Sequence, residues 1–246
     1  KLKVPTTYWC CVNCPGNPGA WKRHAVYHKA VKVQRKVWED GGVMQQRARE
    51  VAEGAARNAA QSGDAYEKLV AEGVRYLSKQ DWRRAARAFR EAIALRPDRP
   101  AAYFNLGSSL NDSGHNVDAA QRYLEAKERH PAGSEYWAEV TAAAFDMLRQ
   151  KECDEVAKPK WWNDEALKAL SARLVRAAPN NEAANTMRAD VLSGGAAQWE
   201  AGPRSAAELS EAAAYYERAV MLSNAPMIKA EYANLADWCR RQAAAM

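Results

Sequence analysis

The sequence contains no run of about 18 apolar residues, which is the length that a helix needs to cross a bilayer. Sequence features that favour β-strands are also scarce. Only 3 of its 246 residues are Phe, and no stretch alternates β-branched with polar residues. Ala, the residue with the highest helix propensity, is abundant instead. We therefore expect an all-α protein with no membrane span.

Motifs of common enzyme chemistry are missing as well. The sequence has no glycine-rich phosphate loop and no serine in a nucleophile elbow. His115 falls in a predicted turn, and His130 falls at a predicted helix end, where a cation favours the helix dipole. Glu139 and Asp146 share one predicted helix, and a solvated surface explains them better than an acid–base pair. The sequence therefore predicts a protein that is not an enzyme.

The 5 cysteines do not have the pattern of a disulfide framework. Cys10, Cys11 and Cys14 cluster near the start, whereas Cys153 and Cys239 stand alone. Isolated cysteines in a chain of this length are typical of buried apolar positions in a reducing compartment. The first residues also lack the apolar core of a signal peptide, so we expect a cytoplasmic location, with a nuclear one as the alternative.

Charge is distributed unevenly along the chain. The formal net charge is +6, but residues 1–60 hold 11 of the 36 Lys and Arg and only 4 of the 30 Asp and Glu. The rest of the chain is close to neutral. This asymmetry indicates a basic N-terminal arm, which either meets an acidic partner or is simply a solvated helix face.

Two consecutive segments, 66–99 and 100–133, have the same residue types at matching positions. Each matching pair is separated by 34 residues. A fixed period of this length indicates repeated helix pairs. The pairs are Gly73 and Gly107, Tyr76 and Leu110, Ala85 and Ala119, Phe89 and Tyr123, Ala92 and Ala126, and Pro97 and Pro131.

Each residue type in this pattern has a physical role. Glycine and alanine let two helices approach closely, the aromatic residue fills the space between them, and proline ends the second helix. The period and the residue types resemble the tetratricopeptide repeat (TPR). This resemblance implies a right-handed superhelix of antiparallel helix pairs, a TPR solenoid, preceded here by a short arm that contains cysteine and histidine.

After the second repeat the register slips. An insertion precedes a predicted helix at 163–177, for which Asn163 or Asp164 is the expected N-cap. A second, glycine-rich insertion follows later. A last helix with one polar face suits the end of a solenoid. The expected organisation is a Cys/His segment over 1–28, a basic helical arm over 29–63 and a TPR domain over 64–243, with repeats at 66–99, 100–133, 134–181 and 182–226 and a capping helix at 227–243.

The arm carries the residue types of a zinc site. Cys10 or Cys11 with Cys14 has knuckle spacing, and His24 and His28 lie one helical turn apart on the same face. Two thiolates and two imidazoles can complete a tetrahedral site. Ordinary packing and surface roles for these residues are the alternative.

The same segment resembles the second half of a MYND-type zinc finger. The matching features are Tyr8 before Cys10, the spacing from Cys10 to Cys14, and Trp21 shortly before the first histidine. The last ligand position, usually cysteine in that family, is His28 here, and the earlier cysteine pairs of the family are absent. The resemblance therefore implies zinc as a cofactor, but it covers only half of the family's zinc-binding motif.

In the TPR family the first helix of each pair lines the ligand-binding concave face. When the family's groove positions are assigned to this sequence by their place in each repeat, they hold six carboxylates and no Lys or Arg. The predicted groove residues are Glu67, Val70, Ala71, Val74, Phe104, Asn105, Ser108, Asp112, Glu135, Ala138, Glu139, Ala142, Asp146, Thr186, Met187 and Asp190.

This composition argues against one known type of TPR ligand. Relatives that bind the acidic tails of chaperones use Lys, Arg and Asn on this face, and only Asn105 matches. Val70 and Val74 stand where a cation and an amide are needed, and Glu135 and Glu139 stand where two cations are needed. A basic or apolar peptide fits better. The alternative is that the acids only solvate the groove.

Two functional hypotheses follow from these patterns. The first is a non-catalytic TPR scaffold that binds a protein or peptide partner through an acidic and apolar groove. The second is a zinc-dependent factor associated with nucleic acid or chromatin through the basic arm, which the absence of a known nucleic-acid motif disfavours. The sequence does not indicate an oligomeric state.

Overall fold

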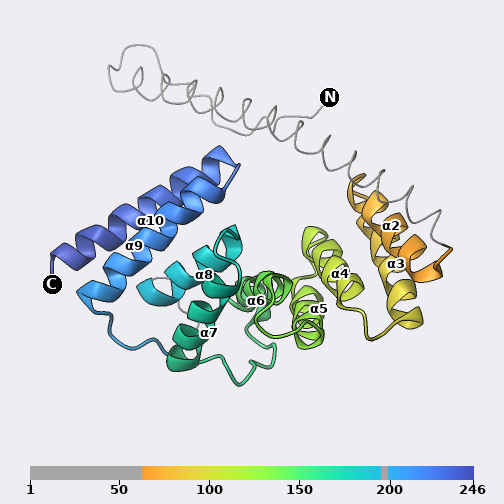
Figure 1. Cartoon of the computed structure of the whole chain (residues 1–246), viewed down its shortest axis with the longest axis horizontal. Coiled ribbons are helices and arrows are strands. Elements are labelled where there is room, and N and C mark those ends of the chain that lie inside the picture. The colour runs from red at the N-terminus through yellow and green to blue at the C-terminus, as the bar shows by residue number, and fades with distance from the viewer. Residues whose placement is uncertain (1–62, 195–198) are drawn as a thin grey trace, which may run out of the picture. The chain divides into compact units, whose positions relative to one another are not determined.

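The computed structural model describes residues 63–194 and 199–246, and within these ranges the regular elements are all helical (Figure 1). This confirms the all-α prediction. None of the helices in these ranges combines the length and the apolarity that a membrane span requires. The elements are α2 (Ala65–Leu77), α3 (Trp82–Leu95), α4 (Pro100–Asp112), α5 (Asn116–Arg129), α6 (Glu135–Leu148), the short 3-10 helix η1 (Lys151–Cys153), α7 (Asp164–Ala177), α8 (Glu182–Ser193), α9 (Ala206–Leu222) and α10 (Pro226–Ala244).

Side-chain caps determine where several helices begin. The carboxylate of Asp64 accepts a hydrogen bond of 2.9 Å from a backbone N–H in the first turn of α2. Ser134 Oγ accepts one of 3.1 Å at the start of α6, and Asn163 Oδ1 accepts one of 3.0 Å at the start of α7. Such caps satisfy N–H groups that have no partner inside the helix. Asn163 is therefore the N-cap, and Asp164, the other predicted candidate, is the first residue of α7.

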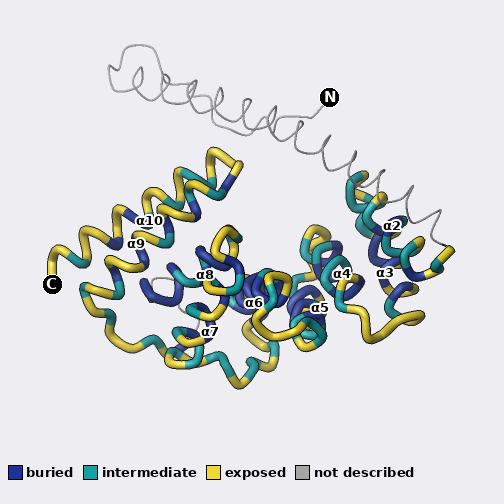
Figure 2. Tube along the Cα trace, viewed as in Figure 1, coloured by how far each residue is buried: buried dark blue, intermediate teal, exposed yellow. Residues whose placement is uncertain are grey.

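The helices pack as consecutive antiparallel pairs. Each helix from α2 to α10 contacts the next one along the chain, and the first helices of neighbouring pairs also meet, as α2 does with α4 and α6 with α8. Figure 2 shows the buried residues along the faces that these contacts cover. This is the arrangement of a TPR solenoid. The buried repeat positions, as predicted, are Gly73, Ala85, Phe89, Ala92, Gly107, Ala119, Tyr123 and Ala126.

Glycine is required where the two helices of a pair cross. A Cβ atom on Gly73 would lie 2.5 Å from the ring of Phe89, and one on Gly107 would lie 2.8 Å from the ring of Tyr123. Both rings are buried, so neither can move aside freely. The close approach expected from the repeat pattern is therefore present in both pairs.

The turns inside the first two pairs share a left-handed residue. Gly114 has a φ of 79°, and Gln80 has a φ of 58° at the equivalent position one repeat earlier. A Cβ atom on Gly114 would meet nothing within 4 Å. A side chain at this position would therefore be disfavoured by the left-handed backbone conformation and not by a steric clash.

We predict that Gln80→Gly raises the free energy of unfolding by about 1 kcal/mol, because a side chain in the left-handed region costs about 1–2 kcal/mol and the gain is partly offset by a more flexible unfolded chain. Urea titration followed by circular dichroism measures this. The reverse change, Gly114→Gln, should lower stability by a similar amount. Equal stability of Gln80→Gly and the wild type would contradict the explanation.

The segment between α6 and α7, where the repeat register slips, packs onto the core. Cys153 is fully buried, as predicted. Lys158 Nζ donates hydrogen bonds to the carbonyl oxygens of Leu148 at 2.9 Å and Cys153 at 2.8 Å. The rings of Phe145 and Trp162 lie 5.6 Å apart. The insertion therefore extends the core and is not a loose surface loop.

Candidate functional site

The predicted groove residues lie on α2, α4, α6 and α8, the first helices of successive pairs. Asp112, Glu135 and Asp146 are exposed, so acidic groups are available on this face. Val70, Val74 and Phe104 are half-buried and pack against the core at its edge. The remaining half-buried members are Glu67, Asn105, Ser108, Glu139 and Thr186.

Several predicted groove residues are buried, which corrects the expectation that they face a ligand. Ala142 and Met187 are 3% and 2% exposed and lie in the core formed by α6, α7 and α8. Ala71 and Ala138 are buried as well. The reason for α6 is that it contacts α5, α7 and α8, so most of its circumference is covered. The position of a residue within the repeat predicts which face of its helix it lies on, but it does not predict how many other helices pack against that face.

The predicted groove positions hold no Lys or Arg, but two arginines outside those positions pair with their carboxylates. Arg99, just before α4, pairs with Glu67 at 3.2 Å. Arg149, at the C-cap of α6, pairs with Asp146 at 3.5 Å and forms a shorter ion pair with Asp190. Both arginines stand at helix ends, outside the repeat positions used to predict the groove. They neutralise part of the acidic charge.

Three acids on this face differ from Glu67, Asp146 and Asp190 in their ion pairing. Asp112, Glu135 and Glu139 form no ion pair with any residue in the described ranges. Although Asp112 is exposed as a residue, partial desolvation of its carboxylate raises its pKa above the usual value. Burial and, to a lesser extent, the nearby Glu135 raise the pKa of Glu139. A cation placed beside these carboxylates would relieve the penalty that raises their pKa values.

A pocket of about 510 Å³ lies where α6, α8, α9 and α10 meet. Its acidic members include Asp146, whose side chain is 63% exposed, and Glu231. Apolar side chains from α10 form much of the remaining wall, including Trp238, which is 37% exposed. The lining residues are Asp146, Arg149, Thr186, Asp190, Ser193, Tyr216, Ile228, Glu231, Tyr232, Leu235 and Trp238.

The base of this pocket is a buried polar network. The Tyr216 hydroxyl donates a hydrogen bond of 2.6 Å to Asp190, which also pairs with Arg149. Burial raises the pKa of Asp190, although the nearby Arg149 opposes this shift. Burial also raises the pKa of Tyr232 to about 12, and its hydroxyl donates to Glu182 at 3.2 Å. Because Asp190, Tyr216 and Arg149 bind mainly one another, ligand recognition falls to the more exposed Asp146 and Glu231 and to the apolar rim.

The α10 contribution to the pocket was not predicted. The sequence indicated a capping helix with one wet face. However, Ile228, Tyr232 and Leu235 follow a helical spacing of four and three residues, which predicts an apolar stripe. That stripe, together with Trp238, is the signal that would have identified α10 as part of the groove.

The predicted zinc ligands Cys10, Cys11, Cys14, His24 and His28 lie outside the described residues, as does the basic arm. Zinc binding at these positions stays a prediction, which metal analysis of the purified chain tests. Within 63–194 and 199–246, no three side chains of His, Cys, Asp or Glu are arranged to hold a metal ion.

Comparison with known proteins agrees with the geometry. A family profile for the tetratricopeptide repeat matches residues 70–134. A solved structure described as a functional characterisation of Pseudomonas aeruginosa PilF superposes with a TM-score of 0.54 and covers 87% of each chain at 18% identity. At this identity the likeness concerns the fold alone. No curated protein matches the sequence.

Proposed function

Because the chain contains tetratricopeptide repeats, we propose that it is a non-catalytic scaffold that holds a basic and apolar peptide segment of a partner protein on the face formed by α4, α6, α8 and α10. The repeats account for a protein-interaction role in general. The charge and apolar character of this face support the choice of ligand.

The pocket between α6 and α10 is the observation that carries the proposal. Asp146 and Glu231 provide two exposed carboxylates, and of the two only Asp146 also pairs with Arg149 of the network below, at 3.5 Å. Trp238 and Leu235 provide an apolar surface beside them. A Lys or Arg side chain can place its aliphatic stem on the apolar wall and its charge beside the carboxylates. The aromatic wall also suits a cation directly.

The acidic residues on α4 and α6 also favour a basic ligand, and they lie outside the pocket. Asp112, Glu135 and Glu139 have no cationic partner among the described residues, so an acidic ligand would meet repulsion there. In TPR proteins that bind acidic tails, cations occupy the positions of Glu135 and Glu139. A long basic segment would therefore be attracted along the inner face and fixed in the pocket.

The one serine–histidine contact in the described part of the chain does not favour catalysis. Ser113 Oγ lies 3.0 Å from His115 Nδ1, but both residues are exposed in the turn between α4 and α5. The Ser113 hydroxyl also lies 2.9 Å from the carbonyl oxygen of Ser109, which accepts its hydrogen. A nucleophile needs its hydrogen directed at the base and a site that excludes water. This contact supports a turn-stabilising role.

We predict that Asp146→Asn combined with Glu231→Gln weakens binding of a labelled peptide of alternating Lys and Leu about tenfold, or about 1.4 kcal/mol, which is what two partly exposed ion pairs contribute. Fluorescence anisotropy with the full chain measures this. Trp238→Ala should weaken binding of the same peptide because the apolar wall is shortened.

The matched control removes two acids elsewhere. Glu152→Gln with Glu155→Gln changes the net charge equally, and both residues are exposed and absent from the pocket. This control should bind the basic peptide nearly as well as the wild type. Equal weakening by both double variants would mean that only overall charge matters, and the proposed site would be wrong.

A further inference from the structure

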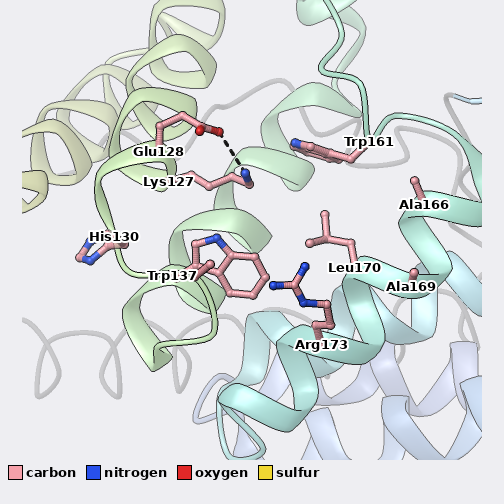
Figure 3. Close-up of a pocket in the computed structure, with 10 residues that line it drawn as sticks. Lys127, Glu128, His130, Trp137, Trp161, Ala166, Ala169, Leu170 and Arg173 are labelled. Carbon is pink, nitrogen blue, oxygen red and sulfur yellow. Dashed lines mark hydrogen bonds and ion pairs between the residues drawn. The ribbon is translucent and has the colours of Figure 1, made fainter.

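A second pocket, of about 440 Å³, lies between the end of α5, the start of α6, the inserted segment and α7 (Figure 3). It shares no residue with the pocket at α10. Its chemistry is also different, because its wall is aromatic and aliphatic and its charged groups include two cations. The lining residues are Lys127, Glu128, His130, Ala132, Trp137, Trp161, Ala166, Ala169, Leu170 and Arg173.

Each cation of this pocket sits against an indole ring. The Lys127 ammonium lies 5.9 Å from the centre of the Trp161 ring, and the Arg173 guanidinium lies 5.1 Å from that of Trp137. In Figure 3 the Lys127 ammonium lies between the two tryptophans, and the Arg173 guanidinium lies beside the Trp137 ring. Lys127 comes from α5 and Arg173 from α7, so two separate helices each contribute a cation to this pocket. Cation–π contacts hold the charges there.

The two cations differ in whether they already form an ion pair within the described part of the protein. Arg173 forms no ion pair with any residue that the structure describes. Lys127 pairs with Glu128 at 3.1 Å, and its side chain is only 11% exposed, whereas that of Glu128 is 73% exposed. Solvent around the exposed Glu128 carboxylate screens this pair and weakens it. A carboxylate from a ligand can therefore replace Glu128 beside Lys127, and a further carboxylate of an acidic segment can pair with Arg173.

The rest of the pocket wall is apolar, so it favours a ligand in which an apolar residue lies next to the bound acidic residue. Trp137 and Leu170 line the pocket and are 4% and 8% exposed. Ala166 and Ala169 leave the α7 side open for a bulky group. Trp161 comes from the insertion that interrupts the repeat register, so a regular repeat would lack this wall.

From this juxtaposition we propose that the pocket lined by Lys127, Trp137, Trp161 and Arg173 binds an acidic peptide segment of a partner protein, with a bulky apolar residue next to the bound carboxylate. The site is independent of the basic-peptide site proposed above. Charge complementarity selects the acid, and the tryptophans and Leu170 select its neighbour.

Arg173→Gln tests the proposal, with a labelled peptide of alternating Glu and Phe as the probe and the full chain as the receptor. We expect about tenfold weaker binding by fluorescence anisotropy, because one hydrogen bond between charged groups is lost. Glu128→Gln should act in the opposite direction and tighten binding, because the competing carboxylate is removed. Raising the salt concentration should weaken binding of the wild type.

Matched controls distinguish this site from general charge effects. Arg176→Gln removes an exposed cation from α7 that does not line the pocket. It should leave binding nearly unchanged, as should Asp146→Asn with Glu231→Gln. Circular dichroism confirms that each variant is folded, and Arg173→Lys should retain part of the affinity.

The source of the bound carboxylate is tested with two forms of the probe. Amidating its C-terminus should leave affinity unchanged if side-chain carboxylates bind, whereas a large loss would assign the site to a chain terminus and contradict the proposed segment. Equal weakening by Arg173→Gln and Arg176→Gln would overturn the proposal. So would affinity for a Gln and Phe peptide equal to that for the Glu and Phe peptide.

Discussion

Asp164→Ala should lower the free energy of unfolding by about 3–5 kcal/mol, the range seen when one partner of a buried ion pair is removed. Asp164, in the first turn of α7, accepts hydrogen bonds from Arg204 at 2.6 and 2.8 Å and from the Trp199 indole at 3.0 Å. The Arg204 side chain is 7% exposed, so it would remain buried without its counterion. Urea titration at neutral pH measures the change.

The same interaction predicts a pH dependence. Hydrogen bonds from Arg204 hold the pKa of Asp164 far below its usual value of 3.8. Those from Lys168 and the Ser205 backbone lower the pKa of Glu208 from 4.5 to about 2. A lowered carboxyl pKa stabilises the fold above the unfolded pKa, and this stability is lost as pH falls through the folded pKa. The difference between wild type and Asp164→Ala should therefore shrink as pH falls from about 4 towards 2.

Glu165→Ala provides the control for this experiment. Glu165 follows Asp164 in the same helical turn but is exposed and has no ion pair within the described ranges. Its loss should cost at most about 1 kcal/mol, through the helix dipole alone. If the two variants were equally stable, the ion pair that joins α7 to the second insertion would not contribute to the fold.

Phe89→Ala should destabilise the protein by about 3–5 kcal/mol, the usual cost of removing a buried phenylalanine ring. Phe89 is fully buried between α2 and α3 and belongs to the core that α4 and α5 share. Thermal and urea unfolding followed by circular dichroism measure the loss. Leu95→Ala, an exposed position at the end of the same helix, should have little effect.

A double-mutant cycle tests whether the ring is what requires glycine at position 73. Gly73→Ala alone should cost about 1–3 kcal/mol, because its Cβ atom overpacks the Phe89 ring. In a Phe89→Ala background the same change should be neutral or stabilising, since alanine is the better helix former by about 0.5–1 kcal/mol. Additive effects of the two changes would show that the contact does not set the glycine requirement.

The repeats and their buried positions could be predicted because each depends on local spacing. Gly73 and Gly107 mark helix crossings, and Asn163 marks a helix start, without knowledge of distant contacts. The cations on the inner face depend on more than spacing. Arg99 and Arg149 stand at helix ends, and their side chains reach carboxylates on other turns or helices only after the pairs have stacked. A register-based prediction assigns no role to such positions.

The second pocket could not be predicted for a related reason. Trp161 lies in an insertion whose path has no counterpart in the repeat, so its position against Lys127 follows only from the packed structure. The α10 residues at the other pocket are an intermediate case. Their spacing forms an apolar stripe that was not predicted, and which surface the stripe covers depends on how α8 and α9 pack.

Helix α6 contributes to both pockets, with Trp137 near its start and Asp146 near its end. Nine residues make two and a half helical turns, so at 1.5 Å of rise per residue these two side chains are attached about 14 Å apart along the axis and on opposite faces of α6. The helix therefore stands between the two pockets, and a short linker between an acidic and a basic stretch of one partner cannot fill both at once. A bivalent partner would need a linker long enough to pass around α6, since each extended residue spans at most about 3.3–3.6 Å. With separate short peptides, saturating one pocket should leave the affinity of the other unchanged.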